Sequence, residues 1–203
     1  GHSAAIDLWQ EGECLHTIAM GHSAVINAAA ATPNGLIVTG SWDKTAKVWT
    51  REGECLQTLT GHTGYIYAVA VTHNNLIVTG SQDKMAKLWS REGECLQTIA
   101  TGHSGSIMAV AVLPDLLTSA RRWLIVTGSY DHTAKLWTQE GECLHTLTGH
   151  TRALNAVAVL PDGLIVTGSQ DATAKVWTQQ GECLQTMLIP IRFQTINALA
   201  VLP

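Results

Sequence analysis

The chain has 203 residues, of which 46% are hydrophobic and 14% are charged, and this composition excludes a disordered protein. Twelve Lys and Arg against sixteen Asp and Glu give a net charge of −4, so there is no overall basic field and we expect no nucleic acid partner. No apolar run approaches the roughly 20 residues that a membrane helix needs, and the first twenty residues lack the pattern of an export signal, so we expect no membrane partner.

Four copies of one hairpin pattern run along the chain. The stretch "LIVTGSWDKTAKVWT" occupies residues 36–50, and close variants follow at 76–90, 124–138 and 164–178. Residues 54–93 and 142–181 are identical at 25 of 40 aligned positions. Self-similarity at a fixed period is the signature of a repeat architecture, so the fold must be built from one copied unit.

Each unit has the two-residue period of β-strands and contains no amphipathic helical stretch. In the second unit we predict strands at 65–72, 76–81, 85–90 and 95–100, joined by short turns rich in Gly, Asp, Asn or Glu. Four antiparallel strands form one twisted sheet, which cannot bury both of its faces by itself. The sheets must therefore stack on one another, and closing the row into a ring would remove its two end faces.

The cysteines all lie in the same context, Gly-Glu-Cys-Leu, and their odd number argues against a closed disulfide framework. No Cys or His pair has zinc-ligand spacing, so we predict no metal site. We interpret them as small, half-buried strand residues that were copied with the repeat. Free thiols favour a reducing compartment, which points to the cytoplasm. The five residues are Cys14, Cys55, Cys95, Cys143 and Cys183.

The order of the motifs resembles the WD40 repeat. Gly-His is followed by an apolar strand, then by Thr-Gly-Ser-x-Asp, then by Ala-Lys-Val-Trp or Ala-Lys-Leu-Trp, and this order covers nearly the whole chain. The resemblance implies an all-β fold, a β-propeller in which four-stranded blades surround a central channel. The sequence departs from the family in one respect. Thr or Ser follows the Trp of each unit, so the Asp of the name-giving dipeptide is absent.

The resemblance also implies a buried, hydrogen-bonded tetrad in each blade. Its members are the His of Gly-His, the Thr of the second strand, the Asp of the following turn and the Trp of the third strand. A buried imidazole needs partners at both nitrogens, and an indole N–H needs an acceptor. The four tetrads are His22, Thr39, Asp43 and Trp49; His62, Thr79, Asp83 and Trp89; His103, Thr127, Asp131 and Trp137; and His150, Thr167, Asp171 and Trp177.

The Thr, His and Asp of one tetrad have the residue types of a hydrolytic triad. Their fourfold repetition, the lack of special activation for a Thr nucleophile and the lack of an oxyanion-hole sequence argue for a structural role instead. We therefore expect no catalytic residues, no cofactor and no enzymatic activity.

The two ends of the chain raise the question of how the ring closes. Residues 4–20 have the pattern of a third and fourth strand and residues 195–203 that of a first strand, but no second strand is left for this blade. Closure by both termini, as in the family, gives a single domain over residues 1–203 with about five blades, the closing blade lacking one strand. A fragment of a larger propeller, or homo-oligomerisation through the incomplete blade, remains an alternative.

Two irregular stretches interrupt the repeat. Residues 115–123 replace one tight turn with an insertion, which we interpret as a tolerated surface loop, with a binding loop as the alternative. Residues 187–195 lack the expected Thr-Gly-His, and Pro190 breaks the strand pattern. We interpret this second stretch as decay of the closing blade rather than as a site.

Function is expected where the repeats differ, because packing explains their identity elsewhere. The variable positions lie just before each tetrad Asp and at the start of each first strand, and in the family these positions face the rim of the central channel. Aromatic residues and Met among Asn and Gln have the composition of an interaction surface. The predicted partner-binding residues are Asn27, Trp42, Tyr65, Tyr67, Gln82, Met108, Tyr130, Asn155, Gln170 and Asn197.

The resemblance implies a non-catalytic scaffold that binds a protein or peptide on this channel face, although a fold is by itself a weak indication of function. Two other functions remain open. A multivalent binder of small ligands or glycans would need similar pocket residues in every blade. An engineered or excised repeat assembly would need no native partner.

Overall fold

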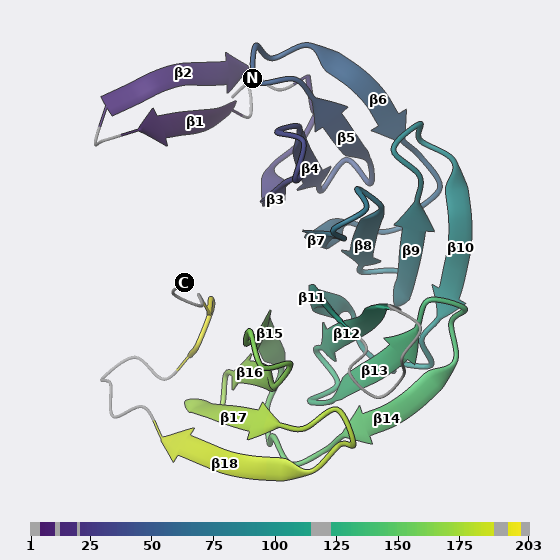
Figure 1. Ribbon diagram of the computed structural model, residues 1–203, viewed down its shortest axis with the longest axis vertical. Coiled ribbons are helices and arrows are strands. Elements are labelled where there is room, and N and C mark those ends of the chain that lie inside the picture. The colour runs from purple at the N-terminus through teal and green to yellow at the C-terminus, as the bar shows by residue number, and fades with distance from the viewer. Residues whose placement is uncertain (1–4, 11–12, 20, 115–122, 189–194, 200–203) are drawn as a thin grey trace.

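The computed structural model describes residues 5–10, 13–19, 21–114, 123–188 and 195–199. Every regular element in these ranges is a β-strand. Four antiparallel sheets of four strands each follow one another around an open arc (Figure 1). The strands of each sheet are hydrogen-bonded in chain order, and the first strand lies nearest the centre of the arc. We call these sheets blades one to four.

The bounds of the blades show how closely the repeat is kept. Blade one comprises β3 (Ile26–Ala31), β4 (Ile37–Ser41), β5 (Ala46–Trp49) and β6 (Cys55–Leu59). Blade two comprises β7 (Ile66–Val71), β8 (Ile77–Ser81), β9 (Met85–Trp89) and β10 (Cys95–Ala100). Blade three comprises β11 (Ile107–Pro114), β12 (Trp123–Ser129), β13 (Ala134–Thr138) and β14 (Cys143–Leu147). Blade four comprises β15 (Leu154–Val159), β16 (Ile165–Ser169), β17 (Thr173–Trp177) and β18 (Cys183–Leu188).

The four strands predicted for the second unit are confirmed as β7 to β10, with ends that differ by one residue at most. The two-residue period sets this outcome, because successive strand side chains point to opposite faces of a sheet. The second strand is buried along its whole length in blades one to four, which is why all four copies read Ile-Val-Thr-Gly-Ser.

Apolar side chains hold neighbouring blades together. Between blades one and two, Val38, Val48 and Leu59 of the first blade pack with residues of the second that include Ile66, Ile77 and Trp89, and all of these side chains are buried. Equivalent clusters join blade two to blade three and blade three to blade four. Blades two and three therefore each bury one face against the blade before and the other against the blade after.

A further pair of strands, β1 (Ala5–Gln10) and β2 (Glu13–Ala19), forms an antiparallel hairpin before blade one. Its register is that of the third and fourth strands of a blade. In the hairpin, Ile6 pairs with Ile18 and Trp9 pairs with Cys14. In blade one, Ala46 pairs with Leu59 and Trp49 pairs with Cys55 in the same relative positions. The prediction of a third and fourth strand at the start of the chain is thus confirmed for the backbone.

The predicted closing blade is not formed. The hairpin is a sheet of two strands only, and residues 195–199, where a first strand was expected, have no regular strand assignment. Figure 1 shows these two segments at opposite ends of the arc, with a gap between them. The four blades are therefore arranged as in a propeller, but the ring is open and a count of about five blades is not confirmed.

The predicted insertion ends one residue earlier than the sequence suggested, because β12 begins at Trp123. Trp123, assigned to residues 115–123, is the first residue of β12, pairs with Pro114 and is buried in the core between blades two and three. Residues 115–122 lie outside the described part of the chain, as do residues 189–194 of the second irregular stretch, which include Pro190. Met187 and Leu188, also counted in that stretch, continue β18.

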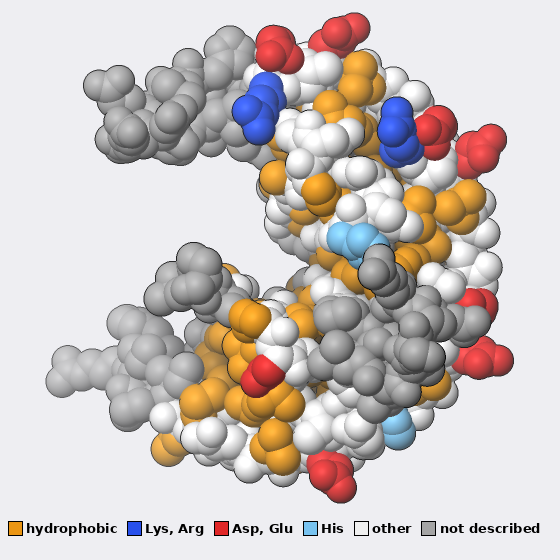
Figure 2. Space-filling view, in the orientation of Figure 1, with side chains coloured by type: hydrophobic (Ala, Val, Ile, Leu, Met, Phe, Trp, Pro, Cys, Tyr) orange, Lys and Arg blue, Asp and Glu red, His pale blue; other side chains and the backbone are white. Residues whose placement is uncertain are grey.

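The cysteine prediction was wrong for the four residues whose side chains are described. Cys55, Cys95, Cys143 and Cys183 are exposed rather than half-buried, because each lies in the outermost strand of its blade. Their thiols are free. Figure 2 shows acidic side chains spaced along the same outer circumference. The outer edge of the arc therefore exposes acidic side chains and thiols, while the packed apolar contacts lie between the blades.

Candidate functional site

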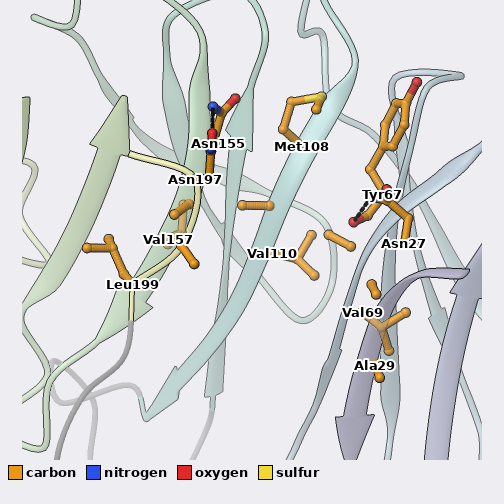
Figure 3. A pocket seen from close by; sticks show the side chains of 15 residues that line it. Asn27, Ala29, Tyr67, Val69, Met108, Val110, Asn155, Val157, Asn197 and Leu199 are labelled. Atoms are coloured by element: carbon orange, nitrogen blue, oxygen red, sulfur yellow. Dashed lines mark hydrogen bonds between the residues drawn. The ribbon is translucent and has the colours of Figure 1, made fainter. Parts of the chain in front are cut away.

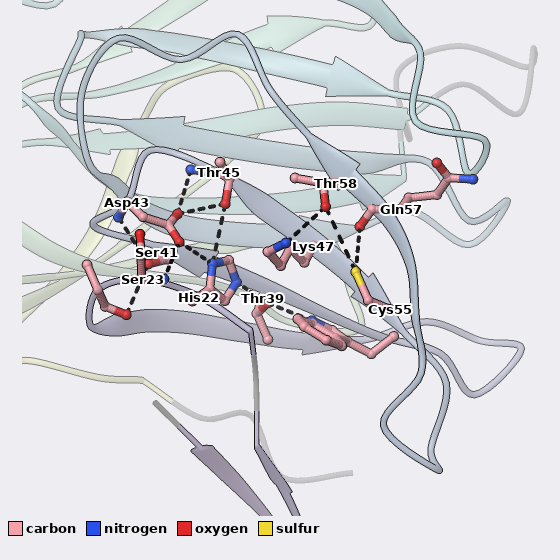
Figure 4. A network of polar contacts seen from close by, with 12 residues as sticks. His22, Ser23, Thr39, Ser41, Asp43, Thr45, Lys47, Cys55, Gln57 and Thr58 are labelled. Carbon is pink, nitrogen blue, oxygen red and sulfur yellow. Dashed lines mark hydrogen bonds and ion pairs between the residues drawn. The ribbon is translucent and has the colours of Figure 1, made fainter. Parts of the chain in front are cut away.

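In blade one the tetrad is a continuous chain of hydrogen bonds (Figure 4). The Nδ1 atom of His22 lies 2.8 Å from Oδ2 of Asp43, and its Nε2 atom lies 2.8 Å from the hydroxyl of Thr39. The indole Nε1 of Trp49 donates to the same hydroxyl at 2.9 Å. The same three contacts measure 2.8–2.9 Å in blades two, three and four.

One arrangement of protons satisfies every group in this chain. Trp49 donates to the oxygen of Thr39, Thr39 donates its hydroxyl proton to Nε2 of His22, and Nδ1–H of His22 donates to the carboxylate of Asp43. The imidazole is then neutral and the carboxylate ionised. The chain connects the first-strand loop to the second and third strands, so it fixes three segments of the blade to one another.

The pKa values of the tetrad agree with this assignment. Burial lowers the pKa of His22, His103 and His150, and the hydrogen bond and charge of the paired Asp only partly offset the fall. Burial by itself would raise the pKa of Asp43, but hydrogen bonds from Thr45 and His22 and from backbone N–H groups outweigh it and lower the pKa to about 2. The pKa values of Asp83 and Asp131 are also lowered to about 2 for the same kind of reason.

A fifth member joins the tetrad in three of the four blades, and sequence analysis missed it. The hydroxyl of Thr45 donates to Oδ1 of Asp43 at 2.6 Å, and Thr133 and Thr173 make the same bond to Asp131 and Asp171 at 2.7 Å and 2.6 Å. Blade two has Met85 at this position. The signal was present in the sequence as Asp-x-Thr, because in these three blades the threonine stands two residues after the tetrad Asp.

The tetrads are built as supports rather than as reactive sites. The hydroxyl that would serve as nucleophile belongs to Thr39, Thr79, Thr127 or Thr167, and each of these residues is 0% exposed. The four tetrad histidines are also buried. A substrate would have to reach the hydroxyl through the packed interior of a blade, so the geometry leaves no room for the hydrolytic alternative.

The predicted channel residues of the first strands do lie together. Asn27, Tyr67, Met108 and Asn155 occupy equivalent positions in blades one to four, and Asn197 follows in the described C-terminal residues. They line a hollow of about 320 Å³ at the centre of the arc. Figure 3 shows them in one layer above a second, apolar layer formed by Ala29, Val69, Val110, Val157 and Leu199. The hollow thus has a polar rim and an apolar wall.

Several amides of the rim bond to one another instead of pointing freely into the hollow. Asn155 donates to Oδ1 of Asn197 at 3.0 Å, and Gln170 donates to Oδ1 of Asn155 at 3.2 Å. Asn27 donates to the backbone carbonyl of Tyr67 at 3.2 Å. These residues hold neighbouring first strands in place, so their contribution to a partner site is in part positional.

The aromatic residues between blades one and two form an exposed cluster. The rings of Trp42 and Tyr65 are stacked, with centroids 5.4 Å apart and planes 14° from parallel. The ring of Tyr67 stands at 87° to that of Tyr65, at 6.3 Å. Trp42 and Tyr65 remain 39% and 36% exposed. We call Trp42, Tyr65 and Tyr67 the aromatic cluster.

The remaining predicted residues lie in the turns that follow the second strands. Tyr130 is 56% exposed, and its backbone N–H donates to Ser106, as the backbone N–H of Gln82 donates to Tyr65. Within the described residues, no ring contact joins Tyr130 to the aromatic cluster. The sequence did not show that the aromatic side chains gather at one junction between blades.

The described residues contain no group of three or more His, Cys, Asp or Glu side chains that could hold a metal ion. The same part of the chain has no helix of the length and apolar character that crossing a membrane requires.

Comparison with known proteins identifies the repeats. The family model described as WD domain, G-beta repeat matches residues 12–50, 53–90, 93–138 and 141–178. No curated protein sequence matches the chain. Among solved structures, the crystal structure of the WD40 beta propeller domain of Doa1 is similar, with a TM-score of 0.74 and 26% sequence identity. The similarity covers 90% of this chain and 58% of that one, so this chain corresponds to little more than half of that propeller domain.

WD40 propellers typically serve as non-catalytic platforms for protein interaction. The four matched repeats, which contain the first, second and third strands of all four blades, show that this chain belongs to the WD40-repeat family of β-propeller proteins.

Proposed function

We propose that the chain is a non-catalytic scaffold that binds a protein or peptide on the channel face, with the aromatic cluster as its main anchor. The observation that carries this proposal is the stacking of Trp42 on Tyr65, with both rings more than a third exposed, beside Tyr67, which lines the central hollow. Stacked, partly exposed aromatic rings supply a large contact area at low cost in conformational entropy.

The surroundings of the cluster favour a peptide over a charged ligand. Tyr67 belongs both to the cluster and to the lining of the hollow, so a chain that covers the rings can continue into the centre of the arc. The lining there consists of Asn, Tyr, Met, Ala, Val and Leu and contains no charged residue among the described ones. A partner that combines an apolar or aromatic side chain with backbone amides would match both parts.

The unequal distribution of side chains argues against a repeated small-ligand or glycan site. The same position of the first strand is Asn27, Tyr67, Met108 and Asn155 in successive blades. Three different residue types at four equivalent positions do not make four copies of one pocket. A single extended partner, which meets each blade with a different part of its own chain, fits this variation better.

Affinity capture with two matched triple variants tests the proposal. Trp42→Ala, Tyr67→Ala, Tyr130→Ala removes the aromatic groups of the channel face. Leu56→Ala, Leu96→Ala, Leu144→Ala removes three apolar side chains that are 42%, 49% and 38% exposed on the outermost strands. Both variants should keep the circular dichroism spectrum of the native chain, because none of the replaced side chains is buried.

We expect a specific protein to be retained by the native chain and by the outer-strand variant, and to be lost by the channel-face variant. A peptide that represents the retained protein should then bind with an affinity that falls at least tenfold in the channel-face variant. Equal recovery by all three chains would contradict the proposal. It would indicate instead that the residues at these exposed positions differ between repeats because of neutral sequence drift. Retention of oligosaccharides on a glycan array, abolished by the channel-face variant, would replace it with the glycan alternative.

A further inference from the structure

Successive blades pack against one another in the same way at all three blade-to-blade contacts. The rear face of a blade, which is the face turned toward the next blade, presents one apolar residue from each of its second, third and fourth strands. In blade one these residues are Val38, Val48 and Leu59. The next blade covers this face with a residue from its first, second and third strands, as Ile66, Ile77 and Trp89 do. A fully covered rear face therefore contacts three apolar side chains of its partner, one from each of the partner's first, second and third strands.

The rear face of blade four is only partly covered. Its fourth-strand residue, Met187, is 37% exposed, whereas the equivalent Leu59, Ile99 and Leu147 are 1–2% exposed. Every residue of β18 is exposed, while the other outermost strands each bury this one position. Figure 2 shows hydrophobic side chains gathered over this end of the arc.

Residues 195–199 occupy the place of the first strand on this face. The backbone N–H of Ile196 donates to the carbonyl of Ser169 at 3.1 Å, and a Cβ on Gly168 would lie 2.6 Å from the Cγ2 of Ile196. Gly40 and Gly80 have the same 2.6 Å relationship to Ile66 and Ile107, the first-strand residues of blades two and three. Blade four is therefore covered near the channel and open toward the circumference, where a third strand with its Trp belongs.

The β1–β2 hairpin has the backbone of the missing part. Its register places Trp9 at the position of Trp49, and the shift between Leu8 and Trp9 reproduces the one between Val48 and Trp49. It is, however, an isolated pair of strands, and a two-stranded sheet is marginal without further packing. The hairpin thus offers a third and fourth strand that no sheet of its own chain incorporates in the described structure.

The hairpin and the open face of one chain lie at opposite ends of the arc (Figure 1). Close-packed interfaces between the blades hold these ends apart, and packed interiors resist compression. A second copy is free of this constraint. We propose that the open rear face of blade four, around Val176 of its third strand and Met187 of its fourth, is an interface for the β1–β2 hairpin of a second copy of the chain.

The resulting contact is head to tail, because one copy contributes its C-terminal end and the other its N-terminal end. Such a heterologous contact closes a ring when the rotation between copies permits and otherwise continues into longer assemblies. The shared blade contains a first strand from one copy and a third and fourth strand from the other. Because the contact joins two separate copies, the extent of association depends on concentration.

Sedimentation velocity of the full chain over a hundredfold range of concentration tests the interface. We expect the native chain to associate as concentration rises. Met187→Glu places a charge on the open face and should leave the chain monomeric over the whole range. Leu184→Glu is the matched control in the same strand, because Leu184 and the equivalent Leu56, Leu96 and Leu144 are exposed in all four blades. This control should associate like the native chain.

Mixing two defective variants distinguishes a head-to-tail contact from a symmetric one. Trp9→Glu alters the hairpin and should also be monomeric alone. In an equimolar mixture with Met187→Glu, the intact hairpin of one variant meets the intact rear face of the other. The mixture should therefore form a dimer that does not grow further. Each variant should keep the β-sheet circular dichroism of the native chain.

Three outcomes would overturn the proposal: a native chain that stays monomeric, equal association of Met187→Glu and the native chain, or a mixture that stays monomeric although the native chain associates. A monomeric native chain in which cysteines placed in β1 and β18 form an intramolecular disulfide would show instead that the hairpin closes its own ring. The test does not involve the channel face, so its result is independent of the proposed scaffold function.

Discussion

The side chain of Ile107 packs directly on the backbone of Gly80. A Cβ placed on this glycine would lie 2.6 Å from the Cγ2 of Ile107 and 2.9 Å from the Cγ1 of Val110. Gly80 belongs to the second strand of blade two, and the other two residues belong to the first strand of blade three. The glycine of the repeated Thr-Gly-Ser thus sets the distance between neighbouring blades.

Gly80→Ala should destabilise the protein by about 1–3 kcal/mol, which is the usual cost of forcing an extra methyl group into a packed core. The free energy of unfolding from urea denaturation measures the effect. Gly21→Ala is the control, because a Cβ at Gly21 would meet no heavy atom within 4 Å. Equal stability of the two variants would mean that the blades can separate slightly without cost.

Asp83→Ala should lower stability by about 2 kcal/mol or more, because it leaves buried donors without their charged acceptor. Asp83 accepts hydrogen bonds from His62 at 2.8 Å, from the backbone of Thr63 at 2.9 Å and from the backbone of Met85 at 3.0 Å. Thermal denaturation compares this variant with Glu52→Ala, which removes an exposed carboxylate. An unchanged melting temperature for Asp83→Ala would remove the structural interpretation of the tetrads.

Met85→Thr should stabilise the protein by about 1 kcal/mol, because it supplies the hydroxyl that blades one, three and four direct at their tetrad Asp. The free energy of unfolding should rise in this variant. Met85→Ser tests the same hydroxyl without the methyl group, and Met85→Val tests the branched shape without the hydroxyl. If Val stabilises as much as Thr, strand propensity rather than the hydrogen bond is the cause.

Stability should fall as the pH is lowered, in two stages. The pKa values of His22, His103 and His150 are lower in the folded protein than the ordinary value of 6.5, so the unfolded chain takes up protons first and stability decreases below about pH 6.5. Those of Asp43, Asp83 and Asp131 are lowered from 3.8 to about 2, so a second loss follows between about pH 4 and pH 2.

Urea denaturation at a series of pH values measures this profile. Asp43→Asn should reduce the second loss relative to the native chain, because the substituted side chain has no proton to gain. A stability that is constant from pH 7 to pH 5 would contradict the assignment of neutral, buried histidines.

Much of the fold follows from the sequence alone, because its signals are local and are repeated four times. The short apolar run that opens Leu-Ile-Val-Thr-Gly-Ser indicates a strand buried on both faces, and the Asp two residues later indicates its turn, whatever surrounds them. Repetition strengthens each of these signals, so the blades and the tetrad partners could be predicted. Asp-x-Thr was overlooked because Met85 interrupts it in the second blade.

Features that depend on how one repeat packs against another were decided only by the tertiary structure. The stacking of Trp42 on Tyr65 joins two blades, and no pattern within one repeat predicts it. Whether the ring is open or closed likewise depends on how the blades pack against one another. Residues 4–20 and 195–203 carry the pattern of one shared blade, but only the packing angles of the four blades between them determine whether they meet. The local pattern therefore determined the unit, and the accumulated geometry of its interfaces left the arc open.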